Sequence, residues 1–321
     1  MTRRRNGLVN FKNLTLRRGA VARTKFYQMK IAIGVDIGGT HITSALIDLD
    51  KKSIVPSSIK RATVNAAGSK EEIIHSWSAC IQEAKDKVEV ESICFAMPGP
   101  FDYEEGISQI QGQAKYEDLY AVNVKQALEQ SLSFPKKSIF MTNDAACFLQ
   151  GEVYAGAVKD FENDTVIGVT LGTGLGSAVY KNGISHSADM WSFPFSESIA
   201  EDYISTRWFV SEWNKTNADK INGVKDLTMK QETDTRVIEI FKIFADNLSG
   251  FLLQFIAREN PAAIVIGGNI AKAYAWFGKR LDANIKSKYP DMKIELAVLG
   301  EEAQLLGAVS GWLHQQKINK A

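Results

Sequence analysis

Two glycine-rich turns in this sequence could bind a phosphate group. The first is Gly38-Gly39, followed by Thr40, and the second is Gly172-Thr173-Gly174-Leu175-Gly176. Glycine lets backbone N–H groups approach phosphate oxygens closely, because no side chain intervenes. Ordinary hairpin turns are the alternative, but a two-residue hairpin turn does not need three glycines in five positions. The glycines therefore predict contact with phosphate, although neither turn has the GxxxxGKS/T pattern of a P-loop.

Asp144 is the residue best placed for acid–base chemistry. It follows the short apolar run at residues 138–141 and precedes Ala145-Ala146, where a predicted strand ends and a helix begins. A carboxylate at such a junction can take the proton of a hydroxyl group during phosphoryl transfer. The local pattern alone also fits a helix N-cap, because Asp and Asn commonly cap helices.

Two strand–turn–strand patterns position the glycine turns. Residues 30–47 and 165–180 both have apolar, strand-like residues on each side of the glycines. The second turn is followed by a strand and not by a helix, which disfavours a dinucleotide-binding fold. Residues 33–38 also match residues 167–172 at a constant offset of 134. Chance is one explanation, but we interpret the match as a duplicated α/β unit that presents two turns to a shared cleft.

Most of the remaining chain has apolar spacing that predicts helices, with short strands between them. In residues 69–88, for example, Ile73, Trp77 and Ile81 fall on one helical face, and Pro98-Gly99-Pro100 ends the strand that follows. The predicted helices cover residues 69–88, 117–132, 196–209, 233–258, 270–286 and 302–314, and the remaining predicted strands cover residues 90–96, 138–141, 262–266 and 293–299.

Four motifs make the sequence similar to one known family. They occur in the order, and at about the spacing, of the ROK family (repressors, open reading frames and kinases) of the hexokinase–actin superfamily. The resemblance covers about residues 30–315 and implies an α/β chain with the two-lobed actin-like, ribonuclease H-like ATPase fold, built from duplicated mixed-sheet units around a central cleft. The motifs are Asp36-Ile37-Gly38-Gly39-Thr40, Asn143-Asp144-Ala145-Ala146, Leu171-Gly172-Thr173-Gly174-Leu175-Gly176 and Ile266-Gly267-Gly268.

The resemblance implies a site for ATP and Mg²⁺ and a site for a sugar. Asp36 would position Mg²⁺ through bound water, and Asp144 would be the general base. The sugar would be bound by Asn143, by the loop that contains Gly99, and by Glu201, for which a solvated helix carboxylate is the alternative. The other nucleotide-binding positions would be Gly38, Gly39 and Thr40 at the phosphates, Gly172, Thr173 and Gly174 at the γ-phosphate, and Gly267 and Gly268 beside the adenosine.

One stretch departs from the family pattern. Many members have a Glu-Ile-Gly-His motif followed by a cysteine-rich zinc segment, whereas this chain has Ala188-Asp189-Met190-Trp191-Ser192 with no cysteine after it. We therefore expect no zinc. Asp189 could replace the glutamate and Ser192 the histidine, and Trp191 could stack on a sugar ring. His186 is a second candidate for the missing imidazole, against an ordinary surface histidine.

Length and composition indicate the size and location of the protein. A chain of 321 residues, 45% of them hydrophobic, can form two lobes of about 150 residues each. We expect a basic N-terminal extension over residues 1–29, an N-terminal lobe over 30–145, and a C-terminal lobe over 146–321 whose last helix packs back on the first lobe. No apolar run reaches the roughly 20 residues that span a bilayer, and no signal-peptide pattern opens the chain. These features predict a cytoplasmic protein with no membrane partner. The cysteines have neither metal-site nor disulfide spacing, so we expect reduced thiols.

The formal charge of +1 hides an uneven distribution. The first 28 residues contain eight basic and no acidic residues, so the rest of the chain is acidic, which argues against nucleic-acid binding by the folded body. The extension has three interpretations: an upstream extension of a protein whose fold begins near Met29, a disordered basic arm, or an arginine-rich targeting or nucleic-acid-binding segment.

The sequence thus predicts a glucokinase-like ATP-dependent kinase that phosphorylates a hexose or an N-acylated hexosamine. The alternative class is a ROK-type sugar-sensing or sugar-binding regulator with little or no kinase activity, but 28 residues are too few for the winged helix that ROK repressors usually carry. A protein-directed ATPase of the same superfamily is a third class, for which the chain lacks an appended peptide-binding domain. The motifs do not identify the sugar, and a homodimer is suggested by the resemblance alone.

Overall fold

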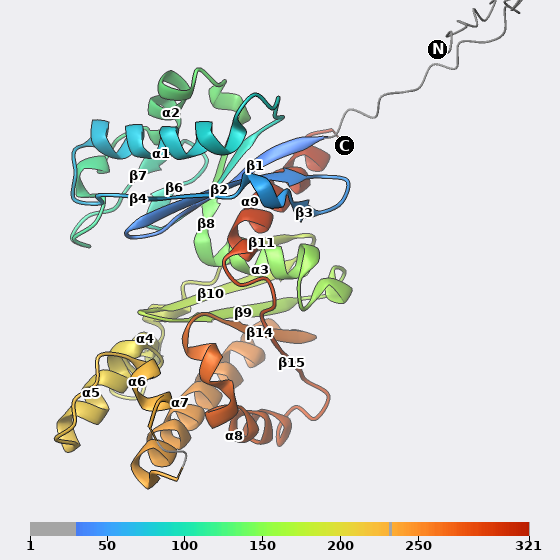
Figure 1. The fold of residues 1–321 in the computed structure, drawn as a ribbon. Coiled ribbons are helices and arrows are strands. Elements are labelled where there is room, and N and C mark those ends of the chain that lie inside the picture. Colours follow the sequence, from blue (N-terminus) through green and yellow to red (C-terminus); the bar gives the residue numbers. More distant parts are fainter. Residues whose placement is uncertain (1–29, 231–232, 321) are drawn as a thin grey trace, which may run out of the picture.

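A computed structural model describes residues 30–230 and 233–320 (Figure 1). The basic extension predicted for residues 1–29 lies outside the described residues. The two larger sheets lie one in each half of the molecule, and helices pass between them (Figure 1). The described chain therefore forms two lobes.

The N-terminal sheet is built around a hairpin that contains the first glycine turn. Its first two strands are antiparallel, and the two strands on the other side of the first strand continue the sheet in parallel. The strand order is β3 (Ser53–Ile54), β2 (His41–Asp48), β1 (Ile31–Ile37), β5 (Ile93–Met97) and β8 (Ile139–Asn143), and β4 (Lys60–Thr63) also pairs with β2.

Two helices, α1 (Lys70–Lys85) and α2 (Val124–Leu132), cover one face of this sheet (Figure 1). The side chain of Ser69 accepts a hydrogen bond from the N–H of Glu72 and caps α1. Ile73, Trp77 and Ile81 recur on one side of α1 and are fully buried against the sheet. Apolar periodicity thus fixes the face of α1 that packs on the N-terminal lobe.

The C-terminal sheet repeats the same arrangement. A hairpin joined by the second glycine turn pairs in parallel with a strand from later in the chain, as expected for a duplicated unit. The strand order is β11 (Ile184–Ser187), β10 (Leu175–Lys181), β9 (Val166–Leu171), β14 (Ala263–Gly267) and β15 (Lys293–Leu296).

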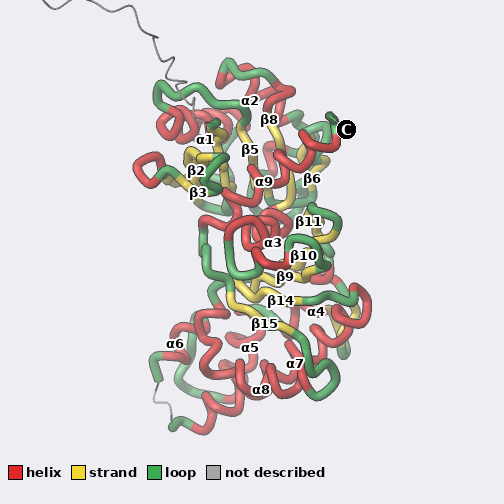
Figure 2. Tube along the Cα trace, turned by 90° about the vertical axis from the view of Figure 1, so that its right-hand side faces the viewer, coloured by secondary structure: helices red, strands yellow, loops and turns green. Residues whose placement is uncertain are grey.

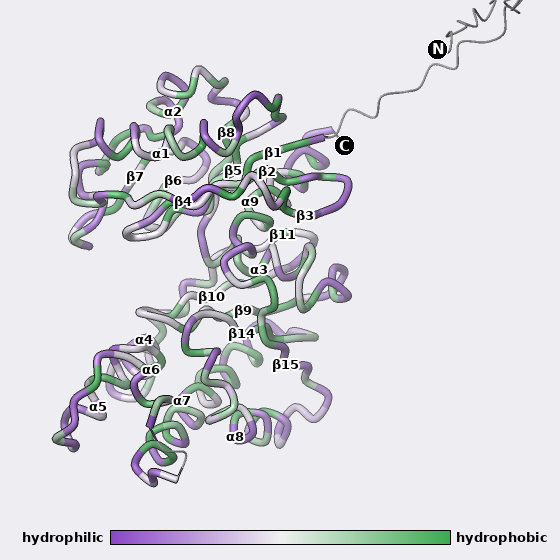
Figure 3. Tube along the Cα trace, in the orientation of Figure 1, coloured by the Kyte–Doolittle hydropathy of each residue, from purple (hydrophilic) through white to green (hydrophobic). Residues whose placement is uncertain are grey.

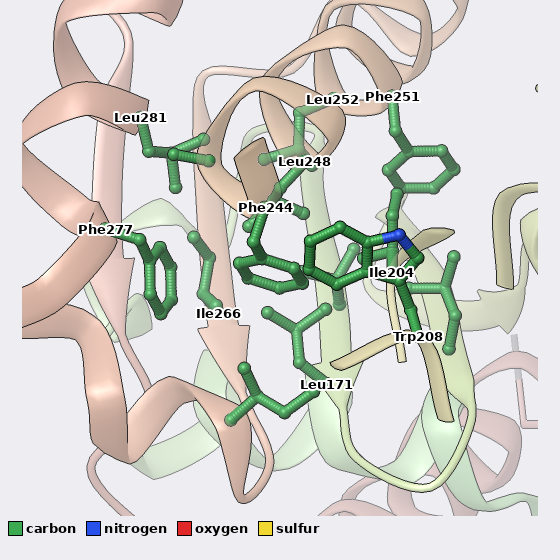
Figure 4. Packing of buried hydrophobic residues seen from close by; sticks show 14 of the residues in the cluster. Leu171, Ile204, Trp208, Phe244, Leu248, Phe251, Leu252, Ile266, Phe277 and Leu281 are labelled. Carbon is green, nitrogen blue, oxygen red and sulfur yellow. The ribbon is translucent and has the colours of Figure 1, made fainter. Parts of the chain in front are cut away.

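Helices pack on one side of the C-terminal sheet around a core rich in aromatic side chains. Figure 4 shows Trp208, Phe244 and Phe277 in contact with Leu171 and Ile266 of the sheet. The helices are α4 (Ala200–Tyr203), α5 (Thr206–Thr216), α6 (Val224–Thr228), α7 (Thr235–Glu259) and α8 (Tyr274–Lys286).

The helix α7 is long and apolar enough to cross a membrane by length and composition. Its most apolar window is 56% buried within the protein, and side chains such as Phe244, Leu248 and Phe251 belong to the core of the C-terminal lobe. Burial against the sheet thus accounts for its hydrophobicity. In Figure 3, hydrophobic and hydrophilic residues alternate along α7, whereas the core strand β1 is mostly hydrophobic.

The helices α3 (Asp144–Ala155) and α9 (Glu302–Ile318) lie between the two sheets (Figures 1 and 2). Glycines allow them to approach very closely. A Cβ on Gly307 of α9 would overlap the backbone of Cys147, and a Cβ on Gly151 of α3 would overlap the backbone of Ala303. The helix α9 also packs on β1 and β5, so this helix pair contacts both lobes.

Two of the predicted helices are wrong in extent. The predicted helix 117–132 is a 3₁₀ turn (Glu117–Leu119) followed by α2, because Ala121 has a φ of 58° and Asn123 caps a new helix. The predicted helix 196–209 is a hairpin followed by α4 and α5. Two small hairpins were not predicted: β6 (Phe101–Asp102) with β7 (Ile107–Ser108), and β12 (Pro194–Phe195) with β13 (Ser198–Ile199).

Candidate active site

Asp36 lies near the end of β1 and Asp144 is the first residue of α3, and the two carboxylates lie near enough for the charge of Asp144 to act on Asp36. Burial raises the pKa of Asp36 to about 7, and the negative charges of Asp144 and Glu301 add to this shift. Burial also raises the pKa of Asp144. Both carboxylates are therefore stronger bases than exposed aspartates.

Asn143 connects β8 to α3. Its Oδ1 accepts hydrogen bonds from the backbone N–H groups of Ala145 (3.0 Å) and Ala146 (3.1 Å), so Asn143 is the N-cap of α3. Asp144 accepts a hydrogen bond from the N–H of Ala145 at 2.8 Å. The capping role that the sequence left open for Asp144 thus belongs to its neighbour.

Tyr103, in the β6–β7 hairpin, is the centre of a second group of predicted site residues. Its hydroxyl accepts a hydrogen bond from Nδ2 of Asn143 at 3.2 Å. A Cβ on Gly99 would lie 3.1 Å from the same hydroxyl. Burial raises the pKa of Tyr103, and the negative charge of Asp144 and, more weakly, that of Asp189 from the other lobe add to this rise. Asn143 and Gly99 thus meet at a tyrosine that no motif indicated, and the charge of Asp189 acts on it from the other lobe.

Asp189, Trp191 and Ser192 lie in and beside a short 3₁₀ turn after β11. The Oδ1 of Asp189 accepts a hydrogen bond from the hydroxyl of Ser187 at 2.8 Å. The hydroxyl of Ser192 donates to the carbonyl oxygen of Asp189 at 3.3 Å, and Trp191 is 45% exposed. Of the two predicted replacements, Asp189 is thus the one whose charge reaches Tyr103, whereas Ser192 bonds within its own turn.

The first glycine turn is closed by a hydrogen bond from the N–H of Gly38 to the carbonyl oxygen of His41 at 2.9 Å. The carbonyl oxygen of Gly38 accepts a hydrogen bond from the hydroxyl of Tyr116 at 2.5 Å. Oγ1 of Thr40 lies 2.8 Å from Nδ1 of His41. Gly39 is exposed, and a Cβ there would meet its nearest neighbour only at 3.9 Å. The tip of the turn thus has room for a ligand.

The second glycine turn joins β9 to β10 and lies beside the start of α3. A Cβ on Gly172 would have no neighbour within 4 Å, and Thr173 is exposed. A Cβ on Gly176 would lie 3.3 Å from the Cβ of Ala145, which follows Asp144. The second turn thus presents open space next to the helix that begins with Asp144, as a phosphate-binding turn requires.

Glu201, in α4, lies against this second turn. Its carboxylate occupies the position that a side chain on Gly174 would need, and it accepts a hydrogen bond from the N–H of Leu175 at 2.9 Å. Its other oxygen pairs with Arg207. Glu201 therefore bonds to the turn and to α5, and it is not a free surface carboxylate.

Gly267 and Gly268 follow the core of β14. Gly268 has a φ of 88°, where only glycine is unstrained, and a Cβ there would overlap the backbone of Leu171. Leu171 directly precedes the second glycine turn. The end of β14 and that turn are therefore neighbours, which suits one ligand that spans both.

The oxygen ligands that the site offers suit a Mg²⁺ ion that is bound partly by water and nucleotide. Asp36 supplies carboxylate oxygens, which Mg²⁺ prefers. Across residues 30–230 and 233–320, no three histidine, cysteine or acidic side chains converge so as to hold a metal ion. A Mg²⁺ ion here would depend on Asp36, water and nucleotide oxygens, an arrangement common for this ion.

A groove of about 680 Å³ lies elsewhere, between α1 and α2. It is lined by residues such as Ile74, His75 and Gln126, and by none of the predicted site residues. Since none of the predicted catalytic or phosphate-binding residues lines this groove, the candidate active site remains at Asp36 and Asp144.

Comparison with known proteins finds one matching family and related sugar kinases. A profile described as "ROK family" matches residues 32–189. The glucokinase of Thermotoga maritima is 25% identical to this chain over 313 residues, which cover 87% of this chain and 96% of that protein.

Solved structures confirm the expected two-lobed fold. The ROK hexokinase from Thermus thermophilus matches with a TM-score of 0.74 at 19% identity, covering 89% of this chain and 99% of that chain. A ROK family glucokinase from Streptomyces griseus, solved in complex with glucose and AMPPNP, matches with a TM-score of 0.69 at 22% identity and the same coverage.

Proposed function

Because this chain belongs to the ROK family and has the two-lobed actin-like ATPase fold, we propose that it is an ATP-dependent sugar kinase. It transfers the γ-phosphoryl group of ATP to a hydroxyl of a hexose or an N-acylated hexosamine. The observation that carries this proposal is the position of Asp144, which lies beside Asp36 and the second glycine turn on one side and Asn143 on the other.

Asp144 acts as the general base. Burial raises its pKa, and a carboxylate with a raised pKa accepts the proton of a sugar hydroxyl more readily than an exposed one. The hydroxyl oxygen then attacks the γ-phosphorus in line with the leaving ADP. The Oδ1 of Asn143 caps α3 and one N–H of its Nδ2 donates to Tyr103, so its second N–H can bind the same sugar.

The nucleotide is held by backbone N–H groups of the two glycine turns and by the end of β14. Asp36 would hold a Mg²⁺ ion at the phosphates, and a bound Mg²⁺ would supply positive charge that offsets theirs. The open space at Gly39 and Gly172 supports this role. The closeness of Gly268 to Leu171 supports placing the adenosine beside Gly267 and Gly268.

The sugar is bound by side chains from both lobes. Asn143 and the loop with Gly99 belong to the N-terminal side, and Asp189 and Glu201 to the C-terminal side. Glu201 keeps acceptor capacity beyond its bonds to Leu175 and Arg207, because a carboxylate has about four lone-pair sites. Ser192 contributes through the turn that orients Asp189.

The test is ADP release from Mg²⁺-ATP with a panel of hexoses and hexosamines, for the wild-type protein and for Asp144→Asn. We expect sugar-dependent ADP release that Asp144→Asn lowers by at least ~10²-fold, the scale of a lost general base. Asp164→Asn, at an exposed aspartate, is the matched control and should retain wild-type activity.

Equal rates for Asp144→Asn and the wild type would remove Asp144 from the mechanism. Sugar binding without ADP release in any condition would instead favour a sugar-binding regulator. A zinc chelator, added with Mg²⁺ in excess, should leave the rate unchanged, since no zinc is expected.

A further inference from the structure

Lys115 is a cation near Asp144 that no motif indicated. It lies in the loop between β7 and the 3₁₀ turn Glu117–Leu119. Its Cδ is 3.9 Å from the position that a Cβ would take on Gly39. Its positive charge opposes the rise that burial causes in the pKa of Asp144. The side chain of Lys115 therefore lies at the edge of the first glycine turn and leaves its tip open, and its charge acts on Asp144.

Hydrogen bonds hold the Lys115 loop on both sides. The carboxylate of Glu117 accepts the backbone N–H groups of residues 112–114 at 2.8–3.1 Å. On the other side, Tyr116 is fully buried, and its hydroxyl donates to the carbonyl oxygen of Gly38. The backbone at Lys115 is thus fixed relative to the first glycine turn, which limits the positions that its ammonium group can take, and pre-positioned charges of this kind favour catalysis.

Two other cations around the site form ion pairs with carboxylates, whereas Lys115 forms none with the residues that the structure describes. Arg61 forms an ion pair with Glu301 at 2.9 Å, and Arg207 pairs with Glu201. Within the described part of the chain, no carboxylate lies within ion-pair distance of Lys115. Its ammonium group is therefore available for an anionic ligand.

We propose that Lys115 binds the γ-phosphoryl group of ATP and stabilises the negative charge on that group during transfer. This inference rests on the proposed kinase function. In the transfer step the sugar oxygen forms a bond to the γ-phosphorus, and the bond from the γ-phosphorus to the bridging oxygen of ADP breaks with its electron pair remaining on ADP. The hydroxyl proton passes to Asp144. The ammonium group of Lys115 supplies charge and hydrogen bonds to the phosphoryl oxygens and gives up no proton.

The first test measures nucleotide affinity and does not depend on activity. Lys115→Met keeps the length of the side chain and removes the charge. We expect it to weaken binding of Mg²⁺-AMPPNP, measured by isothermal titration calorimetry, by about tenfold, the scale of one charge-assisted hydrogen bond. Binding of Mg²⁺-ADP, which lacks the γ-phosphate, should change far less. Lys87→Met, at an exposed lysine of the same lobe, is the control and should change neither affinity.

The second test measures turnover with the best sugar of the panel. We expect Lys115→Met to lower kcat by about 10²-fold, as for loss of one preorganised donor, with the sugar dissociation constant unchanged. Lys115→Arg, which keeps the charge, should retain more of the rate than Lys115→Met.

Three results would overturn the proposal for Lys115. One is an equal loss of affinity for AMPPNP and ADP, and another is a wild-type kcat in Lys115→Met. The third is full recovery of kcat in Lys115→Met at alkaline pH, which would mean that the lysine acts only by favouring the ionised form of Asp144. A wild-type protein with no sugar-dependent ADP release would contradict the kinase function itself, and the two nucleotide affinities would still decide the role of Lys115.

Discussion

The surroundings of Asp36 disfavour the ionised form of its carboxylate. Its carboxylate is partly buried, and it lies near two other acidic residues, Asp144 and Glu301. Desolvation and repulsion both disfavour the ionised form. Such a group persists where function needs it, because binding sites often keep residues that reduce stability.

The pKa of Asp36 has a consequence for stability. The reference pKa of 3.8 rises to about 7 in the folded protein, so between these values the folded protein binds more protons than the unfolded chain. The free energy of unfolding contributed by Asp36 therefore decreases as the pH rises from about 4 to about 7. We expect Asp36→Asn to be more stable than the wild type at pH 8 and to gain little at pH 4, as measured by urea denaturation.

The matched control for this experiment is Asp291→Asn, at an exposed aspartate. Its stability should follow that of the wild type at both pH values. A stabilisation by Asp36→Asn that is the same at pH 4 and pH 8 would contradict the assigned cause, because it would not depend on ionisation.

Sequence motifs identified the site residues that lie in recognisable local patterns, but not those that only tertiary packing brings to the site. Asp36 and Asp144 stand beside glycines or at a strand–helix junction, which are features of local sequence. Tyr103 and Lys115 lie in loops without periodicity, and only tertiary packing brings them to Asn143 and Gly39. Asp189 and Glu201 were proposed from the resemblance, and their placement near Tyr103 and the second turn could not be derived from spacing.

At the scale of elements, the strand–turn–strand units and the long helices were predictable because their apolar periodicity is strong. The predicted helix 117–132 was wrong because a residue with positive φ, Ala121, interrupts a pattern that otherwise has helical spacing. The predicted helix 196–209 was wrong because β12, β13 and α4 are each too short to give a period.

The crossing of α3 and α9 gives a prediction at this scale. Gly307→Ala would place a methyl group into the backbone of Cys147. Overpacking of this kind costs about 1–3 kcal/mol, and we expect the free energy of unfolding, measured by urea denaturation, to fall by that amount.

Gly311→Ala, in the same helix, is the matched control. A Cβ at Gly311 would lie 3.4 Å from the ring of Phe140, an ordinary contact. This variant should be unchanged or gain up to about 1 kcal/mol from helix propensity. Similar effects for the two substitutions would contradict the close approach of the helices at Gly307.

At the scale of the whole molecule, the proposed sugar site draws its side chains from both lobes. Asn143 and Tyr103 belong to one side of the site and Asp189 and Glu201 to the other, and each must reach the same sugar. Closure of lobes on a substrate excludes water from phosphoryl transfer.

We expect the radius of gyration, measured by small-angle X-ray scattering, to decrease when the best sugar and Mg²⁺-AMPPNP are added together. A sugar that does not support ADP release serves as the control and should leave the scattering unchanged. Identical scattering with and without the productive pair would argue for a site that is already closed.

The packing of α9 on β1 and β5 also bears on how the protein is made. The helix comes from residues 302–318, yet it covers a face of the sheet that residues 31–143 build. During translation that sheet emerges from the ribosome long before the helix, so its apolar face has no cover while the second lobe is being synthesised. The N-terminal lobe can reach its final packing only after the helix has been translated, and until then its nascent sheet is a site for chaperone binding or aggregation.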